Sequence, residues 1–142
     1  MPKPNIVIDT NVLYAALRSR RGASAKLLSL VGTGLFEVHL SVSLVLEYEA
    51  VLLEKSRSLP VTKDVIVDVI DSLCALGKHH EVYFLWRPYL PDAGDEMVLE
   101  AAVVSGSEYI VTYNTKNFRG AEQFGIEVVT PKMFLQKIGA IK

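Results

Sequence analysis

The chain alternates short apolar runs with longer stretches in which apolar residues recur every three or four positions. Residues 5–9 form one such run, which lacks the polar alternation of a half-exposed strand and ends on Asp9. A run of this kind is typical of a strand buried on both faces of a parallel sheet. Further runs rich in β-branched or aromatic residues predict strands at residues 36–40, 79–85, 109–112 and 126–129.

Helical periodicity fills the intervals between these strands. Ser41 or Ser43 is placed to cap one helix, Thr62 caps another, and Pro131 suits the first turn of the last. The predicted helices cover residues 11–17, 23–31, 44–52, 63–76, 92 to about 106, and 132–138. Residues 88–91 are expected to form a rigid loop. Because strands and helices alternate throughout, the sequence predicts an α/β fold with a central parallel sheet covered by helices.

Composition places the chain among globular proteins. Its 142 residues are 50% hydrophobic and 22% charged, and no linker divides them, so a single domain over residues 1–142 is expected. The formal net charge of −1 gives no general attraction for nucleic acid. The single cysteine excludes an internal disulfide and paired-cysteine zinc chemistry. With neither a signal peptide nor an apolar run of membrane-spanning length, a cytoplasmic protein with no membrane partner is expected.

Asp9 is the sharpest candidate for chemistry, since it stands where the first strand gives way to a helix. Ligands bind at the carboxyl ends of strands in open α/β sheets, and a buried charge there needs a partner or a metal. The alternative is that Asp9 caps the following helix. Asn11 could serve equally well as the cap, which would leave Asp9 free to act as a ligand.

Two later groups of acids also fall near the starts of predicted helices. Glu47 and Glu49 are two residues apart, about 200° around a helix, so one of them should face water. Asp92 and Asp95 resemble an N-cap and its third helical residue, which is the structural alternative to a metal role. With Glu96, however, they crowd three carboxylates into one turn, and a bound cation would relieve their repulsion.

Other polar residues give weaker indications. Thr112, Asn114 and Asn117 follow a strand at the same sheet end as Asp9, where they could orient a water or a phosphate oxygen or simply form a turn. His79 and His80 should point to opposite faces of a strand, which argues against a joint metal site. A basic turn that contains Arg18, Arg20 and Arg21 is either solvated or a contact for phosphate groups.

In these residues the chain resembles the PIN domain family, in particular the VapC-like ribonucleases that are the toxins of bacterial and archaeal toxin–antitoxin operons. The resemblance covers nearly the whole chain. It rests on the order and spacing of residues 7–13, 40–52, 92–102, 109–118 and 125–131. It implies a three-layer α/β/α fold around a central parallel sheet, and a pocket that binds Mg²⁺ or Mn²⁺ and cleaves single-stranded RNA.

The resemblance also implies roles for individual residues. Asp9, Glu47 and Asp95 match the first three acids of the family pattern and would hold the metal, with Asp92 or Glu96 as further acids. The fourth acid of the family falls in the loop after Thr112, where this chain has the amides Asn114 and Asn117. Such an amide still ligates through its carbonyl but adds no charge, so a second metal would be held more weakly. Thr10, Asn11, Thr112 and Asn117 would orient the carboxylates or water.

The partners implied by the resemblance are single-stranded RNA, a small cognate antitoxin and a second copy of the chain in a homodimer. Two other functions remain open at this point. The amides at positions 114 and 117 are compatible with a module that binds RNA or antitoxin with little nuclease activity. A phosphohydrolase built around Asp9 ranks lower, because position 11 is Asn rather than the second Asp of a DxD pair.

Overall fold

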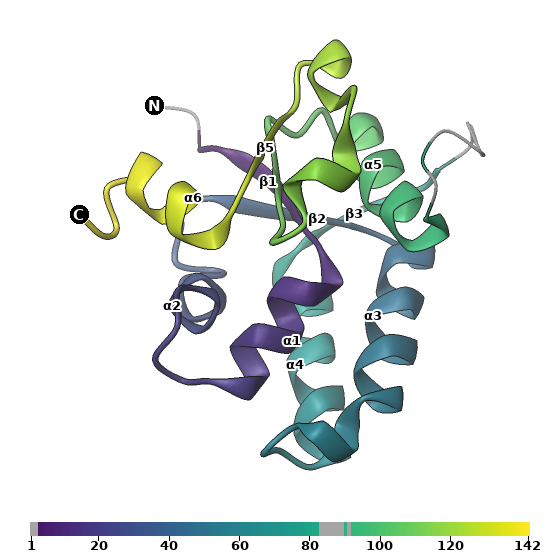
Figure 1. The fold of residues 1–142 in the computed structure, drawn as a ribbon, viewed down its shortest axis with the longest axis vertical. Helices are drawn as coiled ribbons and strands as arrows, with labels where there is room; N and C mark the ends of the chain where they lie inside the picture. The colour runs from purple at the N-terminus through teal and green to yellow at the C-terminus, as the bar shows by residue number, and fades with distance from the viewer. Residues whose placement is uncertain (1–2, 83–89, 91) are drawn as a thin grey trace.

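The structure is a computed structural model that describes residues 3–82, 90 and 92–142. Five parallel strands form one sheet in the order β3-β2-β1-β4-β5 (Figure 1). The strands are β1 (Asn5–Ile8), β2 (Glu37–Ser41), β3 (Lys78–His80), β4 (Tyr109–Val111) and β5 (Glu127–Val129). The predicted parallel sheet is therefore confirmed, with each predicted strand present and its ends shifted by one or more residues.

Helices alternate with the strands as predicted. In the described residues they are α1 (Thr10–Arg18), α2 (Ala23–Ser29), α3 (Val42–Glu54), α4 (Lys63–Leu76), α5 (Ala93–Ser105) and α6 (Pro131–Lys137), with short 3₁₀ helices η1 (Ser56–Ser58), η2 (Thr115–Phe118) and η3 (Ala121–Phe124). Ser41 is the cap of α3, and its hydroxyl accepts from Leu44 N at 3.2 Å. None of the described helices is long and apolar enough to cross a membrane.

One helix and one strand end at least two residues before their predicted ends. The helix expected to reach residue 31 ends at Ser29, because the next amides donate to carbonyls only three residues back and tighten the chain. The strand expected at residues 79–85 is confined to Lys78–His80. Its partner β2 ends at Ser41, opposite His80, so residues 81 and 82 have no strand beside them. Residues 83–85, and all but Leu90 of the predicted loop at 88–91, lie outside the described residues.

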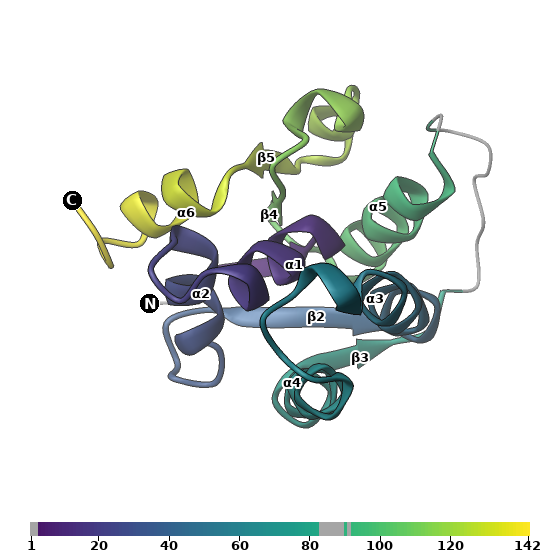
Figure 2. The ribbon, with the colours of Figure 1, turned by 60° about the horizontal axis from the view of Figure 1, so that its bottom comes forward.

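The order of the strands reverses at β1. The chain moves outward from β1 to β2 and β3, then returns to place β4 on the other side of β1. With the right-handed crossovers usual for parallel strands, this reversal puts α5 on the opposite face of the sheet from α1–α4, which gives the expected three layers. Figure 2 shows α1 and α5 each beside α3. The gap between the carboxyl ends of β1 and β4 is therefore the crevice in which folds of this kind bind ligands.

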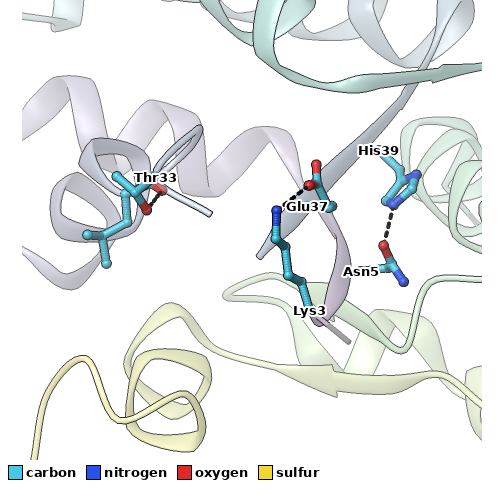
Figure 3. A network of polar contacts seen from close by, with 6 residues as sticks. Lys3, Asn5, Thr33, Glu37 and His39 are labelled. Carbon is cyan, nitrogen blue, oxygen red and sulfur yellow. Dashed lines mark hydrogen bonds and ion pairs between the residues drawn. The ribbon is translucent and has the colours of Figure 1, made fainter. Parts of the chain in front are cut away.

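Side-chain contacts fix the amino ends of β1 and β2, as Figure 3 shows. Lys3 Nζ lies 3.2 Å from Glu37 Oε1, and His39 Nε2 lies 2.8 Å from Asn5 Oδ1. Since that oxygen can only accept, His39 Nε2 donates, and its Nδ1 then accepts from His80 Nε2 at 2.7 Å. His79 instead contacts the carbonyl of Cys74, so the two adjacent histidines have different partners, as expected.

Candidate active site

Asp9 occupies the crevice between β1 and β4. Its side chain is 7% exposed, and each oxygen accepts a hydrogen bond: Oδ1 from Thr10 N and Oδ2 from Thr112 Oγ1, both at 2.7 Å. Asp9 is thus itself the N-cap of α1, and the expectation that Asn11 could take that role is wrong. The strand ends at Ile8 and the helix begins at Thr10, one residue earlier than expected, which leaves position 9 as the only junction residue.

Burial is the main influence on the pKa of Asp9. Its pKa is raised above the ordinary value by burial first, while the hydrogen bonds from Thr112 and Thr10 lower it in part. The hydroxyl of the buried Tyr48, on α3, donates to the carbonyl of Ile8 and so fixes the backbone one residue before this carboxylate. The result is a carboxylate held in one orientation by α1, α3 and β4 together.

The loop after β4 is bonded to the start of α1. Asn11 Nδ2 donates to Thr112 Oγ1 at 3.3 Å, and Asn11 Oδ1 accepts from Tyr113 N at 3.3 Å. Asn114 N donates to the same Thr112 oxygen at 3.0 Å. These bonds hold Thr112 in the rotamer that reaches Asp9. The structure therefore brings Thr10, Asn11 and Thr112 together around Asp9.

Glu47 reaches the same region from the second turn of α3. Its side chain is half-buried, whereas Glu49 is exposed, so the expectation that one of the two faces water is confirmed. The helix start of α5 lies close to it. An added Cβ on Gly94 would be 2.9 Å from Glu47 Oε1 and 3.1 Å from Asp92 Oδ1. Any residue other than glycine at position 94 would therefore displace one or both of these carboxylates.

The start of α5 supplies two more acids. Asp92 caps the helix, since its Oδ1 accepts from Gly94 N at 2.7 Å and from Asp95 N at 3.3 Å. Asp95 is 8% exposed, and its pKa is raised to about 6 by burial and by the negative charges of Asp9, Asp92 and Glu47. A hydrogen bond from Asn117 lowers the Asp95 pKa in part. These four carboxylates therefore repel one another across a shared space.

That space is a cleft of about 170 Å³, here called the acidic cleft. Its described lining consists of Asp9, Thr10, Asn11, Tyr14, Glu47, Val51, Lys55, Asp92, Gly94 and Asp95. Glu96 is not part of this lining; its carboxylate is buried and accepts from Leu90 N. The four acids proposed from the sequence as metal ligands thus line one cleft.

The remaining sequence candidates divide into two groups. Both amide side chains are exposed, but Asn117 forms a hydrogen bond with Asp95, whereas Asn114 donates its backbone N–H to Thr112 Oγ1. The exposed Arg18, Arg20 and Arg21 lie at or just beyond the other end of α1. That end is roughly 12 Å along the helix from Thr10, at 1.5 Å per residue. The structure does not bring these arginines into the acidic cleft.

The lining of the acidic cleft suits a hard divalent cation by its chemistry. It offers carboxylate and amide oxygens and no thiol or imidazole, which matches the preference of Mg²⁺ and Mn²⁺. In the described part of the chain no three His, Cys, Asp or Glu side chains converge into a ready-made ion site. Mg²⁺ does not need one, since it is commonly held by one or two carboxylates and keeps several waters. The residues present therefore fit such an ion.

Four lining residues were not among the residues predicted for the site: Tyr14, Val51, Lys55 and Gly94. The signal for Lys55 is its spacing, because Glu47, Val51 and Lys55 recur every four residues and fall along one side of α3. Tyr14 follows Asn11 by three residues, which also places the two on one helix side. Gly94 had no comparable signal, since its role depends on how closely α3 approaches α5.

Comparisons with known proteins agree with this geometry. Residues 5–116 match the family model described as PIN domain. No curated protein matches the sequence. A solved structure with a similar fold is that of VapBC2 from Rickettsia felis bound to a DNA fragment from their promoter. That match has a TM-score of 0.59 at 14% sequence identity and covers 87% of this chain and 98% of the other. Because the family model spans well over half of its residues, the chain belongs to the PIN domain family.

Proposed function

We propose that the chain is an endoribonuclease that cleaves single-stranded RNA with Mg²⁺ or Mn²⁺, and that it is the toxin of a toxin–antitoxin pair. The observation that carries this proposal is the acidic cleft, in which Asp9, Glu47, Asp92 and Asp95 meet at the reversal point of the sheet. PIN domains are generally metal-dependent nucleases, which is the activity that such a carboxylate cluster supports.

Asp9, Glu47 and Asp95 are the residues proposed to hold the ion, with Asp92 at the edge of the site. A bound Mg²⁺ or Mn²⁺ supplies Lewis-acid stabilisation of the phosphoryl charge and acidifies water for in-line attack. Thr10 N and Thr112 Oγ1 keep both oxygens of Asp9 oriented. Asn117 restrains Asp95, whose pKa in the metal-free site is about 6, so protons compete with the ion for this carboxylate near neutral pH.

The position of the amides favours Asn117 as the residue that replaces the fourth acid. It bonds Asp95 directly, while Asn114 donates its backbone N–H to Thr112 and leaves its side chain exposed beside that residue. We infer that Asn117 positions Asp95, and that Asn114 contacts the RNA or a water there. Because an amide at position 117 carries no negative charge, we infer that the site binds one ion rather than two.

The toxin assignment rests on the fold neighbour, which is a VapBC complex on its promoter DNA. By analogy, the chain would be masked by a small antitoxin and would form a homodimer. Arg18, Arg20 and Arg21 would contact RNA phosphates away from the scissile bond, since they lie at the far end of α1.

A second function is favoured by one observation. The amides at positions 114 and 117 remove the charge with which related sites bind a second ion, so a module that binds RNA or antitoxin with little cleavage is the alternative. Incubation of purified protein with labelled single-stranded RNA, double-stranded RNA and single-stranded DNA, each with Mn²⁺, Mg²⁺ or EDTA, separates the two. Cleavage of single-stranded RNA that EDTA abolishes supports the nuclease. Binding of RNA without cleavage in any metal supports the module.

A further inference from the structure

We propose that Lys55 is the residue that binds the RNA backbone within the acidic cleft, and that Tyr14 holds it in place. This inference rests on the proposed function and adds a substrate-binding residue to it. Lys55 is the one cation in the described lining of the cleft, where it faces four carboxylates. An anionic substrate that enters such a cleft needs a positive charge beyond the bound ion, because the unneutralised carboxylates repel it.

The helix geometry fixes where this charge stands. Glu47, Val51 and Lys55 line the cleft at intervals of four residues along and just past α3. Eight residues of helix separate Glu47 from Lys55 by roughly 12 Å. The backbones of Glu47 and Lys55 therefore lie two helical turns apart on one side of the cleft. A phosphodiester chain laid along the cleft would meet the ion at one phosphate and Lys55 at a neighbouring one.

Tyr14 of α1 holds the lysine from the opposite wall. Lys55 Nζ lies 5.4 Å from the centroid of the Tyr14 ring, within the range of a cation–π interaction. Ser58 Oγ donates to the Lys55 carbonyl at 2.8 Å, so it accepts from the Tyr14 hydroxyl, which lies 2.6 Å away. The ring is thus tied to the turn that carries Lys55, and the ammonium is held against the ring.

The ammonium is also available to a ligand. Within the part of the chain that the structure describes, no carboxylate forms an ion pair with it, and the side chain is exposed. Lysine binds a phosphate as a point charge and needs no fixed bidentate geometry, which suits a flexible single strand. The arginine-containing turn is different, because it lies outside the cleft and can contact only parts of the RNA that extend beyond it.

The test compares Lys55→Ala with the control Arg57→Ala. Arg57 carries the same charge two residues further along the chain, and its side chain is exposed and outside the described cleft lining. Binding of a fluorescein-labelled single-stranded RNA is followed by fluorescence anisotropy at several salt concentrations. One series is measured in EDTA, and a second is measured with Mg²⁺ in variants that also carry Asp9→Asn. Lys55→Ala should weaken binding several-fold and reduce the slope of log affinity against log salt by about 0.7, the value for one phosphate of a single strand. Arg57→Ala should keep the parent slope, and Lys55→Arg should restore it.

The outcomes separate this inference from the proposed function. A parent slope retained in Lys55→Ala, or no RNA binding by the parent protein in either condition, would overturn the role of Lys55. Cleavage by the wild-type protein is scored in parallel, with the expectation that Lys55→Ala raises KM more than it lowers kcat. If the slope falls but the wild-type protein cleaves no RNA in any metal, Lys55 binds RNA and the nuclease proposal alone fails.

Discussion

Thr112 Oγ1 donates to Asp9 Oδ2 over 2.7 Å and so joins the carboxyl ends of β1 and β4 across the reversal point of the sheet. The same oxygen accepts from Asn11 Nδ2 and from Asn114 N. One hydroxyl therefore orients the most buried acid of the cleft and anchors the loop beside it. This relationship makes Thr112 as informative a position for mutagenesis as the acids themselves.

Thr112→Val should keep the shape of the side chain and lose the bond. Because the bond lowers the pKa of Asp9, its loss should raise that pKa further and move the acid limb of the pH–rate profile to higher pH. Cleavage should fall about tenfold, as is usual when a partner of a metal ligand is removed. Thr112→Ser, which retains the hydroxyl, is the matched control. Equal pH profiles for the Val and Ser variants would contradict the role given to this bond.

The raised pKa of Asp95 makes the stability of the metal-free protein depend on pH. A carboxyl whose folded pKa is about 6, against an ordinary 3.8, contributes stability below pH 3.8 that is lost as the pH rises through 6. In EDTA the wild-type protein should therefore lose unfolding free energy between pH 4 and pH 7 through this group. Asp95→Asn should be more stable than wild type at pH 7.5, by on the order of 1 kcal/mol, with no such gain near pH 4. Urea unfolding at both pH values measures this.

Mn²⁺ should reverse that pH dependence in the wild-type protein. Metal binding requires ionised carboxylates, so the affinity for Mn²⁺ should fall as the pH drops below about 6. Mn²⁺ should raise the melting temperature of the wild-type protein at pH 7.5 and have less effect at pH 5. An equal shift at the two pH values would show that Asp95 does not contribute to the site.

Gly94→Ala tests the close approach of α3 to α5. The new Cβ would lie 2.9 Å from Glu47 Oε1, the end of a flexible side chain, so the carboxylate should move while the fold persists. We expect the affinity for Mn²⁺ to fall about tenfold, with little change in melting temperature. Gly22→Ala is the control, since nothing lies within 4 Å of its added Cβ. Unchanged Mn²⁺ affinity in Gly94→Ala would show that Glu47 is not a ligand.

Asn117→Asp restores an acid at the position next to Asp95. A fifth carboxylate should strengthen Mn²⁺ binding and, in EDTA, lower the unfolding free energy at pH 7.5 by adding repulsion. Asn114→Asp places the same charge on a residue that bonds Thr112 through its backbone, whereas Asn117 bonds Asp95 through its side chain, so the change at position 114 should affect both quantities less. Calorimetric titration with Mn²⁺ and urea unfolding give the two readouts. A larger effect at position 114 would reverse the assignment of the two amides.

The sequence predicted a parallel sheet and the positions of its strands from local patterns, and it indicated the four acids of the cleft from such patterns together with the family resemblance. Apolar runs mark the strands, and the ends of parallel strands meet at one edge of a sheet. The start of α1 was misjudged, because Asp9 and Asn11 are equally good caps by residue type. Only the length of β1 decides between them.

Other parts of the site depend on distances between elements that are far apart in the sequence. The approach of Gly94 to Glu47 joins α5 to α3, and the contact of Lys55 with Tyr14 joins the end of α3 to α1. Neither follows from a local pattern. The basic turn, by contrast, gave a clear sequence signal but lies outside the cleft, since the direction of α1 carries it away from Asp9.

The most direct test of the central claim compares Glu47→Gln with Glu49→Gln in an RNA cleavage assay. The two variants make the same chemical change on one helix. Glu47 lines the acidic cleft, whereas Glu49 is exposed to solvent. With Mn²⁺ and single-stranded RNA in single-turnover conditions, we expect Glu47→Gln to cleave about 100-fold more slowly than wild type and Glu49→Gln to match wild type. Equal rates for the two variants would contradict the claim that this cleft is the catalytic centre.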